Sequence, residues 1–478
     1  MKKTLQSSLA LSALAAALLL AGCASAPAID PMALPAVPAA FKEAGAQWAP
    51  TAPAEAQPRG AWWQAFADPA LDKLVERAGE RNTSVQAAAA RLAQARALLG
   101  RANAERWPQV GVSAGVQRAS NPDTGWQPVN LGSAGASVSY EADLFGRLSR
   151  SAQAATLDAQ ARDALLQSTR LMAQADVAQS YFLLRALDVE RGIVGDTLKA
   201  HRNTLRLVES RQRAGDVAEL DVARVRTELA ETESEALALD ARRALLEHAI
   251  AVLVGDTVAG FSIEPAPWRS VVPLVPVGVP SGVLARRPDV SAALNQMQAA
   301  QLRVGVAQAA WFPNLSLTAS GGYASPELSD VFKWSARSWA VGALLSLPVF
   351  DGGRRQAGVD AAQASLELSL ADYRQQVLVA FREVEDELSQ LRSLDERSKA
   401  QARAVESAVR ATTLSESRYR NGLVSQLELL DAQRSELRSR RQEVQVKVAQ
   451  FQSTVGLIRA LGGGWEAHGD SNGKVAGL

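Results

Sequence analysis

The sequence has one cysteine, few aromatic residues and almost no net charge. Of its 478 residues only 5% are aromatic, and 51 basic residues nearly cancel 50 acidic ones. A single cysteine, Cys23, excludes an internal disulfide, and the balanced charge gives no electrostatic footprint for nucleic acid. The shortage of aromatics, together with many alanines, favours slender, closely packed helices over a large globular core.

Sequence patterns typical of catalysis or metal binding are also missing. The three histidines, His201, His248 and His468, are scattered and have no metal-ligand spacing. The glycines of Phe145-Gly146-Arg147 and Asp351-Gly352-Gly353-Arg354 are not followed by the Lys-Ser/Thr of a phosphate loop. No nucleophile–base pattern is visible. The sequence therefore predicts neither an enzyme nor a metal or cofactor site.

The N-terminus has the pattern of a targeting segment. Lys2 and Lys3 precede a short apolar run that ends at Leu20-Ala21-Gly22-Cys23. This ending resembles a bacterial lipobox, so we predict a signal peptide over 1–22 and lipidation of Cys23, with diacylglycerol on its thiol and an acyl chain on its new amino group. The alternative is a plain secretory signal with an incidental cysteine.

Two features beyond Cys23 bear on location. In lipoproteins of this kind, Asp after the cysteine favours retention in the inner membrane, whereas Ala24 fits delivery to the outer membrane. After the signal, no apolar run of about 18 residues remains, so no transmembrane helix is expected.

The rest of the chain contains one unit twice, and a repeat has to be recognised before the fold is judged. Trp107-Pro108 corresponds to Phe312-Pro313, and Gly215 to Gly422, with corresponding positions 205 to 207 residues apart. Each unit consists of two strands followed by a very long helical hairpin.

The strands are predicted from alternation. Val110, Val112, Ala114 and Val116 share one face, with small or polar residues between them. Apolar-out and polar-in over roughly ten residues is typical of outer-membrane strands; a half-buried soluble sheet is the alternative. Tryptophans near the strand ends suit aromatic girdles. The predicted strands are about 108–118, 133–144, 314–323 and 338–349, and the tryptophans are Trp107, Trp126, Trp311, Trp334 and Trp339.

The hairpins are predicted over 147–254 and 354–461. Their first helices contain no proline over about 66 residues, which corresponds to roughly 100 Å and exceeds any ordinary globular helix. The returning helices are shorter, so 70–106 and 289–312 are expected to form helices that fill the difference. The predicted organisation is a signal peptide (1–22), a lipidated tether (23–60), a first repeat (61–262), a linker (263–288), a second repeat (289–462) and a C-terminal tail (463–478).

Four strands cannot close a membrane barrel, because open edges in lipid leave backbone groups unpaired. Closure therefore requires several chains. The composition does not give their number.

Taken together, the motifs resemble the TolC-like outer membrane efflux proteins, specifically the NodT/OprM-type lipoproteins. The resemblance covers about residues 60–462. It is carried by Trp62-Trp63 with Phe66 and Asp68-Pro69, Tyr140 to Arg147, Gly278-Val279-Pro280-Ser281, Arg286-Arg287-Pro288-Asp289, Trp311 to Leu315, Arg418 to Gly422, and Leu427 to Asp431.

The resemblance implies a homotrimer in the outer membrane that extends into the periplasm. Its fold would be mixed α and β, with a 12-stranded β-barrel continued by a 12-helix α-barrel. It would be the gated, passive exit channel of a tripartite pump, joined by a periplasmic adaptor to an inner-membrane transporter of the resistance-nodulation-division type. Small amphiphilic compounds would be exported, with outer-membrane lipid as surroundings and no cofactor.

The resemblance also implies a periplasmic gate at the hairpin tips. Aligned on the tip glycines, a tyrosine–aspartate link falls on Tyr419 and Asp221, and two acidic ring positions fall on Glu428 and Asp431. Glu428 stands where many members have Asp, and Val424 replaces a basic residue that adds a link in some, so the network is expected to be sparser. The tip residues implied to meet the adaptor are Gly215, Asp216, Gly422 and Leu423.

Structural interpretations exist for the same residues. Ser425 followed by Glu428 forms a capping box, and Asp216 with Glu219 is an analogous cap. Asp431 would otherwise belong to a solvated helix face. Gly215 and Gly422 fit the left-handed conformation that follows a helix end.

Two other functions remain open. The same architecture serves type I protein secretion, although the lipobox and Arg286-Arg287-Pro288-Asp289 favour efflux. A periplasmic coiled-coil adaptor or structural lipoprotein without a pore is the third reading. Two matched hairpins and two strand pairs argue against it, because an adaptor would show one hairpin flanked by small β domains.

Overall fold

A computed structural model describes residues 34, 36–43, 60–120, 126–275 and 280–463. The predicted signal peptide, the lipidation site Cys23 and nearly all of the C-terminal tail lie outside these residues. The chain forms two compact units. One contains Ala90–Asp163 and Ala292–Gln375, and the other contains the described parts of Ala36–Ala89, Ala164–Ser291 and Gln376–Leu478.

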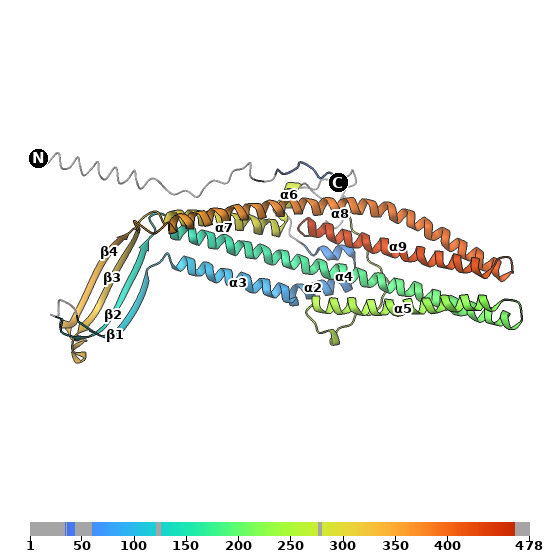
Figure 1. Ribbon diagram of the computed structural model, residues 1–478, viewed down its shortest axis with the longest axis horizontal. Helices are drawn as coiled ribbons and strands as arrows, with labels where there is room; N and C mark the ends of the chain where they lie inside the picture. Colours follow the sequence, from blue (N-terminus) through green and yellow to red (C-terminus); the bar gives the residue numbers. More distant parts are fainter. Residues whose placement is uncertain (1–33, 35, 44–59, 121–125, 276–279, 464–478) are drawn as a thin grey trace, which may run out of the picture. The chain divides into compact units, whose positions relative to one another are not determined.

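The first unit contains the sheet. Strands β1 (Gln109–Ala119), β2 (Val129–Ala142), β3 (Asn314–Ser325) and β4 (Arg337–Ser346) pair antiparallel in the order β1-β2-β3-β4, as Figure 1 shows. The central β2–β3 pair joins one strand from each repeat, so the two repeats share a single sheet.

Two strand boundaries differ from the predictions by three residues or more, and the others agree within two residues. β2 begins at Val129, four residues before the predicted start. Its backbone still pairs with β1 as far as Ala119, although the apolar residues in this stretch no longer fall on the same face as those of the predicted strand. β4 ends at Ser346, before the predicted end at 349. Pro348 lies in that interval, and a proline has no N–H to donate to a strand ladder.

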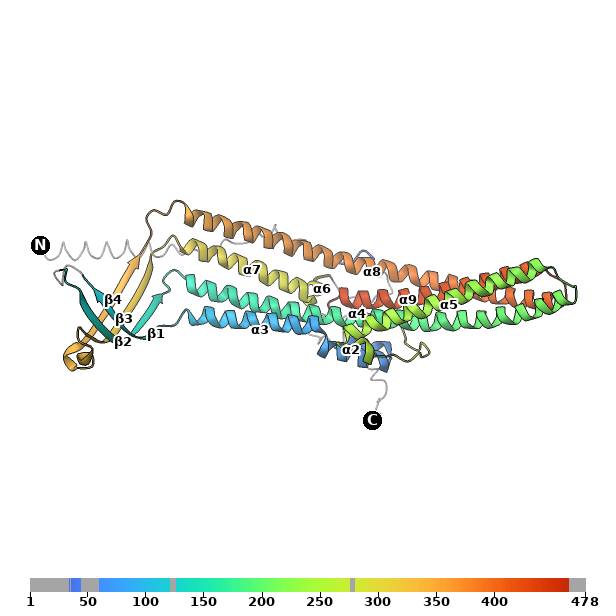
Figure 2. The ribbon, with the colours of Figure 1, turned by 60° about the horizontal axis from the view of Figure 1, so that its bottom comes forward.

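Helices occupy most of the remaining chain. Their bounds are α2 Pro69–Arg81, α3 Thr83–Ala104, α4 Arg147–Arg213, α5 Glu219–Leu253, α6 Pro280–Arg286, α7 Pro288–Ala309, α8 Arg354–Arg420 and α9 Gln426–Ala460. In Figure 2, α8 and α9 form one antiparallel hairpin and α4 and α5 the other. Among the described residues, no helix combines the length and hydropathy needed to cross a bilayer.

The helix predicted over 70–106 is instead two helices that meet at Asn82. The backbone of Asn82 is extended, at φ −61° and ψ 126°, so α2 ends there. Its side-chain oxygen accepts from the N–H groups of Ser84 and Val85 at 2.9 and 3.2 Å, which caps α3. Its amide nitrogen also donates to the Leu253 carbonyl at 2.8 Å, so a tertiary contact fixes the break.

The core of the second unit, which is mainly aliphatic, contains an aromatic cluster. The Phe182 ring lies 4.6 Å from the ring of Phe451 and 4.9 Å from that of Phe66, centroid to centroid. Trp268, from the segment between the repeats, lies 4.9 Å from Phe451. Since each fully buried apolar side chain contributes roughly 1.5–3 kcal/mol, this cluster fixes the linker segment against both hairpins.

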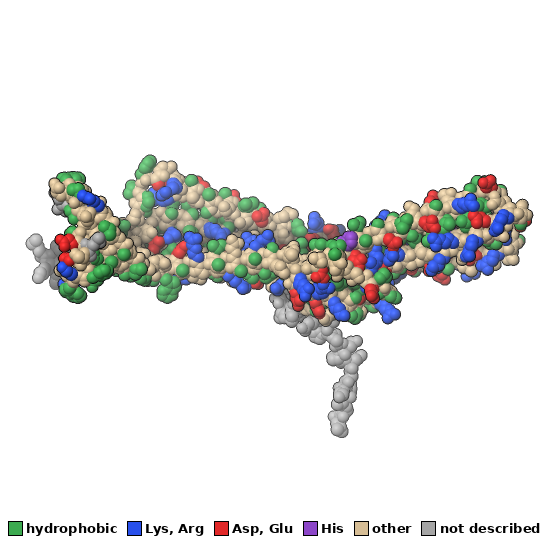
Figure 3. Space-filling model, turned by 90° about the horizontal axis from the view of Figure 1, so that it is seen from below, with side chains coloured by type: hydrophobic (Ala, Val, Ile, Leu, Met, Phe, Trp, Pro, Cys, Tyr) green, Lys and Arg blue, Asp and Glu red, His purple; other side chains and the backbone are tan. Residues whose placement is uncertain are grey.

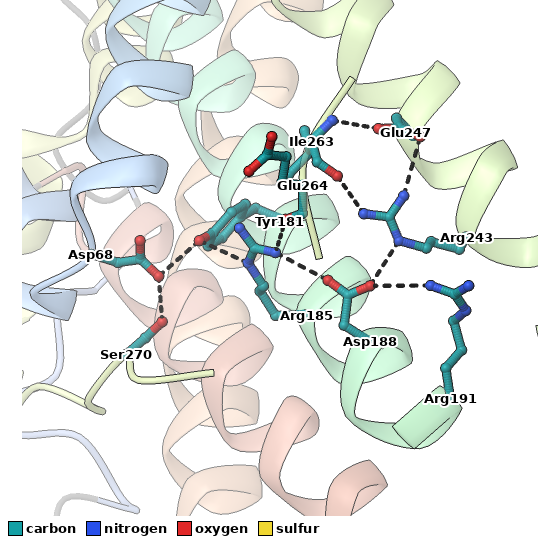
Figure 4. A network of polar contacts seen from close by, with 10 residues as sticks. All are labelled: Asp68, Tyr181, Arg185, Asp188, Arg191, Arg243, Glu247, Ile263, Glu264 and Ser270. Carbon is teal, nitrogen blue, oxygen red and sulfur yellow. Dashed lines mark hydrogen bonds and ion pairs between the residues drawn. The ribbon is translucent and has the colours of Figure 1, made fainter. Parts of the chain in front are cut away.

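A buried polar network lies beside this cluster (Figure 4). The Tyr181 hydroxyl donates to the Asp68 carboxylate at 2.9 Å and accepts from Nε of Arg185 at 3.0 Å. Arg185 also donates to the Glu264 carbonyl at 2.8 Å and to Asp188 at 3.0 Å. Burial raises the pKa of Tyr181 to about 12, against the opposing effect of Arg185. The network therefore ties the start of α2 and the linker to the middle of α4.

The motif Arg286-Arg287-Pro288-Asp289 has an equivalent role in the second repeat. Arg287 is buried and binds Asp289 through two bonds, at 3.1 and 2.6 Å. It also donates to Glu383 of α8 at 2.7 Å and to the Ala460 carbonyl at 3.0 Å, where α9 ends. A bidentate arginine suits such a junction, because its planar donors point in several fixed directions.

Candidate channel and gate

The strand register places apolar side chains on one face of the sheet. Val110 is opposite Val138, Val138 is also opposite Ala319, and Ala319 is opposite Val341. The next rows continue this face, and its larger members are open to the surroundings: Val112 is 87% exposed and Val341 76%. An apolar surface of this extent on a folded unit indicates contact with lipid or with another protein.

The opposite face consists mainly of small and polar residues, with Leu131 and Leu344 as the exposed large apolar exceptions. Ser137 is opposite Gly111 and Ser320, and Ser139 is opposite Gln109 and Thr318. Gly135 and Gly322 face each other so closely that a Cβ on Gly322 would lie 2.4 Å from the Ala134 carbonyl oxygen. The polar face is therefore suited to contact with water. It has no room for a larger side chain where Gly135 of β2 pairs with Gly322 of β3.

Exposed tryptophans lie at the strand ends. Trp107 precedes β1, Trp126 precedes β2, and Trp334 and Trp339 lie before and within the start of β4. Tryptophan prefers a membrane–water interface, where its ring is in the apolar region and its N–H reaches water. This placement fits the predicted girdles.

Both edges of the sheet are open within the described residues, since β1 pairs only with β2 and β4 only with β3. An unpaired edge presents free N–H and C=O groups and favours pairing with another strand. Because β1 and β4 come from the two ends of one sheet, copies of the chain could pair edge to edge in a ring.

The two helical hairpins turn in the same way. Gly215 and Gly422 have φ of +82° and +72°, as the left-handed interpretation predicted. The Asp216 N–H donates to the Arg211 carbonyl at 2.9 Å, and the Leu423 N–H donates to the Arg418 carbonyl at 2.9 Å. This pattern satisfies the last carbonyls of each long helix and reverses the chain.

The predicted caps differ between the hairpins. The Ser425 side chain accepts from the Glu428 N–H at 3.3 Å, so the cap of α9 is present. The cap predicted from Asp216 and Glu219 is wrong: the residue before α5 is Ala218, which has no side-chain acceptor. Asp216 instead belongs to the turn that ends α4.

The predicted link between Tyr419 and Asp221 is not a hydrogen bond in this structure. Tyr419 is buried and its hydroxyl has no hydrogen-bond partner, while the Arg211 guanidinium lies over its ring, 5.1 Å from the centroid. Asp221 lies 3.7 Å from Nη1 of Arg224. Burial raises the pKa of Tyr419; Arg211 opposes this rise and the Asp221 carboxylate adds to it. The Asp221 carboxylate therefore acts on the Tyr419 hydroxyl electrostatically, without a hydrogen bond between them.

The two acidic positions, Glu428 and Asp431, are both exposed on the first turns of α9. They are three residues apart and therefore lie on one face of the helix. Figure 3 shows acidic and basic side chains interspersed over the hairpin end. Glu428 and Asp431 are accessible to solvent or to a neighbouring chain.

Ion pairs that the sequence interpretation missed join the hairpins further from the tips. Arg434 of α9 pairs with Glu228 of α5, and Arg441 pairs with Glu190 of α4 at 2.6 Å and with Glu235 of α5. The two arginines are seven residues apart, and so are Glu228 and Glu235. This heptad spacing of opposite charges on the two returning helices is the sequence pattern from which the ion pairs could have been predicted.

A buried histidine lies beside these pairs. His201 of α4 is almost completely buried, and its Nδ1 has no hydrogen-bond partner. Burial lowers its pKa, and the Arg434 charge lowers it further. The imidazole is therefore neutral at physiological pH. In the described part of the chain, no group of three or more His, Cys, Asp or Glu residues could hold a metal ion.

Comparison with known proteins gives one consistent result. The model of the family "Outer membrane efflux protein" matches residues 74–256 and 279–463. The chain is 33% identical over 406 residues to the solvent efflux pump outer membrane protein SrpC of Pseudomonas putida, covering 84% of this chain and 86% of SrpC. It is 34% identical over 472 residues to the pyoverdine export outer membrane protein OpmQ of Pseudomonas aeruginosa, covering 96% and 97%.

A solved structure agrees with these relatives. The outer-membrane channel OprN superposes with a TM-score of 0.85 at 31% identity, covering 93% of this chain and all of the OprN chain. The match extends over both the sheet and the hairpins, so it concerns the whole architecture rather than one element.

Proposed function

Since the chain belongs to the outer membrane efflux protein family, we propose that three copies form the exit channel of a tripartite efflux pump. The observation that carries this proposal is the sheet, with its apolar exposed face, its small polar face and two open edges. Three sheets joined edge to edge make a 12-stranded barrel with lipid outside and water inside. The chain is then an outer-membrane protein whose hairpins extend into the periplasm.

The hairpin tips supply the proposed adaptor surface. Leu220, Leu423 and Leu427 are each more than half exposed at the tips. Exposed leucines beside tip turns of fixed geometry suit docking of another protein. We assign this surface, with Gly215 and Gly422 as its turn positions, to a periplasmic adaptor connected to an inner-membrane transporter of the resistance-nodulation-division type.

The exported compounds are proposed to be small and amphiphilic. SrpC is named for solvents and OpmQ for pyoverdine, which are chemically distant, so similar channels carry different cargo. This variety suits a passive duct whose transporter selects. It also favours efflux over type I protein secretion, and the sheet disfavours an adaptor or structural lipoprotein without a pore.

Lipid attachment at Cys23 is part of the proposal and rests on the lipobox. Cys23→Ser is expected to remove the lipid mass from the mature protein in mass spectrometry. A wild-type protein that begins before or after Cys23, without added lipid, would contradict it.

The gate is proposed to lie at the start of α9. Threefold symmetry would bring three copies of Asp431 together, and those of Glu428 one turn closer to the tips. Like charges held close together repel one another, so such rings would also attract cations. If so, divalent cations added from the periplasmic side should reduce the conductance of the wild-type channel and affect Asp431→Ala less.

Single-channel conductance in a planar bilayer tests the function. The wild type is expected to conduct weakly, and Asp431→Ala to conduct several-fold more, since a ring that narrows the tip is lost. Glu406→Ala, on the exposed surface of α8, is the matched control and should behave as wild type. A folded trimer that never conducts would refute the channel, whereas a large conductance unchanged in Asp431→Ala would refute only the gate.

A further inference from the structure

A cleft opens between the two hairpins of the second unit, beginning about one helical turn from the end of α8. Its volume is about 260 Å³. Three helices form its walls with residues spaced three or four apart, which lie on one face of each helix. The lining used below is Asp196 and Thr197 of α4, Thr412 and Glu416 of α8, and Gln433 and Glu436 of α9.

Gln433 is the unusual member of this lining. Its side chain is only 9% exposed, and its amide oxygen has no hydrogen-bond partner. A buried acceptor without a donor costs roughly 1–3 kcal/mol, so such groups in native proteins call for an explanation. Thr412, on the opposite wall, does not supply a donor, because its hydroxyl faces the carbonyls of Ala408 and Ala432, both at 3.1 Å.

The lining of the cleft contains more carboxylates than basic side chains. Asp196, Glu416 and Glu436 contribute three carboxylates to the lining, and Arg440 is the basic residue among the lining residues. Each carboxylate has a basic partner on its own helix, namely Lys199 at 3.0 Å, Arg420 at 3.7 Å and Arg440 at 2.7 Å. Within the described residues these carboxylates do not converge as metal ligands do. The excess of carboxylates in the lining favours a cation with several N–H donors. Ile193 and Leu437 form an apolar part of the lining, so the rest of the ligand should be apolar.

We propose that this cleft is a binding site for a small amphiphilic organic cation, such as an aromatic primary amine. The ammonium group donates to the Gln433 amide oxygen and is attracted by Glu416 and Asp196. The ring lies against the apolar lining. The volume suits a compound of one or two rings, since it is below the about 300–1,000 Å³ usual for larger ligands.

The position of the cleft gives its occupant a further effect. α4 belongs to the first hairpin, and α8 and α9 belong to the second, so a bound amine contacts both. A ligand that binds only when the walls are together stabilises that arrangement of the hairpins. Occupancy should therefore make the helical end more resistant to opening, whichever compounds the channel exports.

The test uses the full-length purified protein and two matched probes. Tryptamine carries the ammonium group, and tryptophol, with a hydroxyl in its place, is the neutral control. Isothermal titration calorimetry should show tryptamine binding at least about tenfold more tightly than tryptophol, and weakening as salt increases. Thermal unfolding should shift upward with tryptamine.

Gln433→Leu separates a ligand site from a packing site. Leucine removes the unpaired acceptor at similar size, so the free protein should be at least as stable as wild type. Tryptamine binding should nevertheless weaken about tenfold or more, because a hydrogen bond to a charged group is lost. Glu416→Gln should weaken it several-fold, whereas Glu406→Gln on the same helix should not.

Three results would overturn the proposal. The first is no binding of tryptamine to wild type. The second is equal binding of tryptamine and tryptophol, which would mean an apolar cleft without cation preference. The third is unchanged binding in both Gln433→Leu and Glu416→Gln. Loss of folding in Gln433→Leu would contradict the stability argument and leave Glu416→Gln to decide binding.

Discussion

Arg434 on α9 forms an ion pair with Glu228 on α5, and this contact joins the second hairpin to the first. The Glu228 side chain is 8% exposed, whereas that of Arg434 is half exposed. Because the carboxylate is buried and the guanidinium can reach water, loss of the arginine is the more damaging change. The ion pair lies two turns of α9 beyond the cap at Ser425, on the same helix as the proposed gate.

Arg434→Leu is expected to weaken the attachment between the hairpins. It leaves the Glu228 carboxylate buried without this partner, which costs on the order of 3 kcal/mol. We expect a lower unfolding temperature and a conductance above that of wild type. Arg438→Leu, an exposed arginine on the same helix, should change neither. Restoration of both properties by adding Glu228→Leu would support the pair, and a wild-type conductance in Arg434→Leu would argue against its role.

Tyr419→Phe is expected to leave the conductance unchanged. The hydroxyl that it removes is buried without a hydrogen-bond partner, so its loss should be neutral or stabilise the protein by about 1 kcal/mol. Tyr419→Ala should instead lower the unfolding temperature, because it removes the ring beneath Arg211. A conductance that rises in Tyr419→Phe would show that the hydroxyl links to Asp221 in the assembled channel.

Glu387→Gln is expected to stabilise the protein at neutral pH. Glu387 accepts from the Ser453 hydroxyl at 2.5 Å, and burial raises its pKa above the ordinary value of 4.5. The folded state thus keeps its proton to higher pH than the unfolded state. The stabilisation that the protonated Glu387 carboxyl gives the folded state is complete below pH 4.5, and it is lost as the pH rises through the raised pKa.

The corresponding measurement is the unfolding temperature of wild type and variant between pH 4 and 8. The advantage of Glu387→Gln should appear as pH rises and vanish near pH 4. Glu396→Gln, exposed on the same helix, should show no such trend. A variant less stable than wild type at pH 7 would mean that the charged form is favoured.

Gly322→Val is expected to prevent assembly of the membrane-embedded trimer. A Cβ at this position would lie 2.5 Å from the Gly135 Cα, and backbone cannot move aside as a flexible side chain can. Gly321→Ala is the matched control, because no atom lies within 4 Å of its added Cβ. Trimer recovered from outer-membrane fractions, resolved on semi-native gels, should be lost only in Gly322→Val. Equal amounts of trimer in both would contradict the close approach.

The sequence predicted the fold class because each of its signals is local or repeats. Alternation at Val110, Val112 and Val116 indicates a strand without reference to any partner, and the family comparison and the structure confirm the mixed α and β architecture. The tip glycines were equally predictable, since a helix that ends in a left-handed residue needs one.

The failures have identifiable causes. The break at Asn82 depends on the Leu253 carbonyl, which is 171 residues away in the sequence. The start of β2 depends on pairing with β1 where the alternation had changed phase. The cap predicted at Asp216 failed because that residue completes the preceding turn, and two structural motifs competed for it.

The sequence by itself determined the repeat, the strand faces and the hairpin turns, because these follow from backbone geometry and residue spacing within one segment. Only the tertiary structure decided that β2 and β3 unite the repeats, that Arg434 meets Glu228, and that Gln433 is buried with an unpaired oxygen. The first two depend on segments about 200 residues apart, and the third on the packing of α9 beside α4 and α8. All three depend on how whole helices and strands pack together.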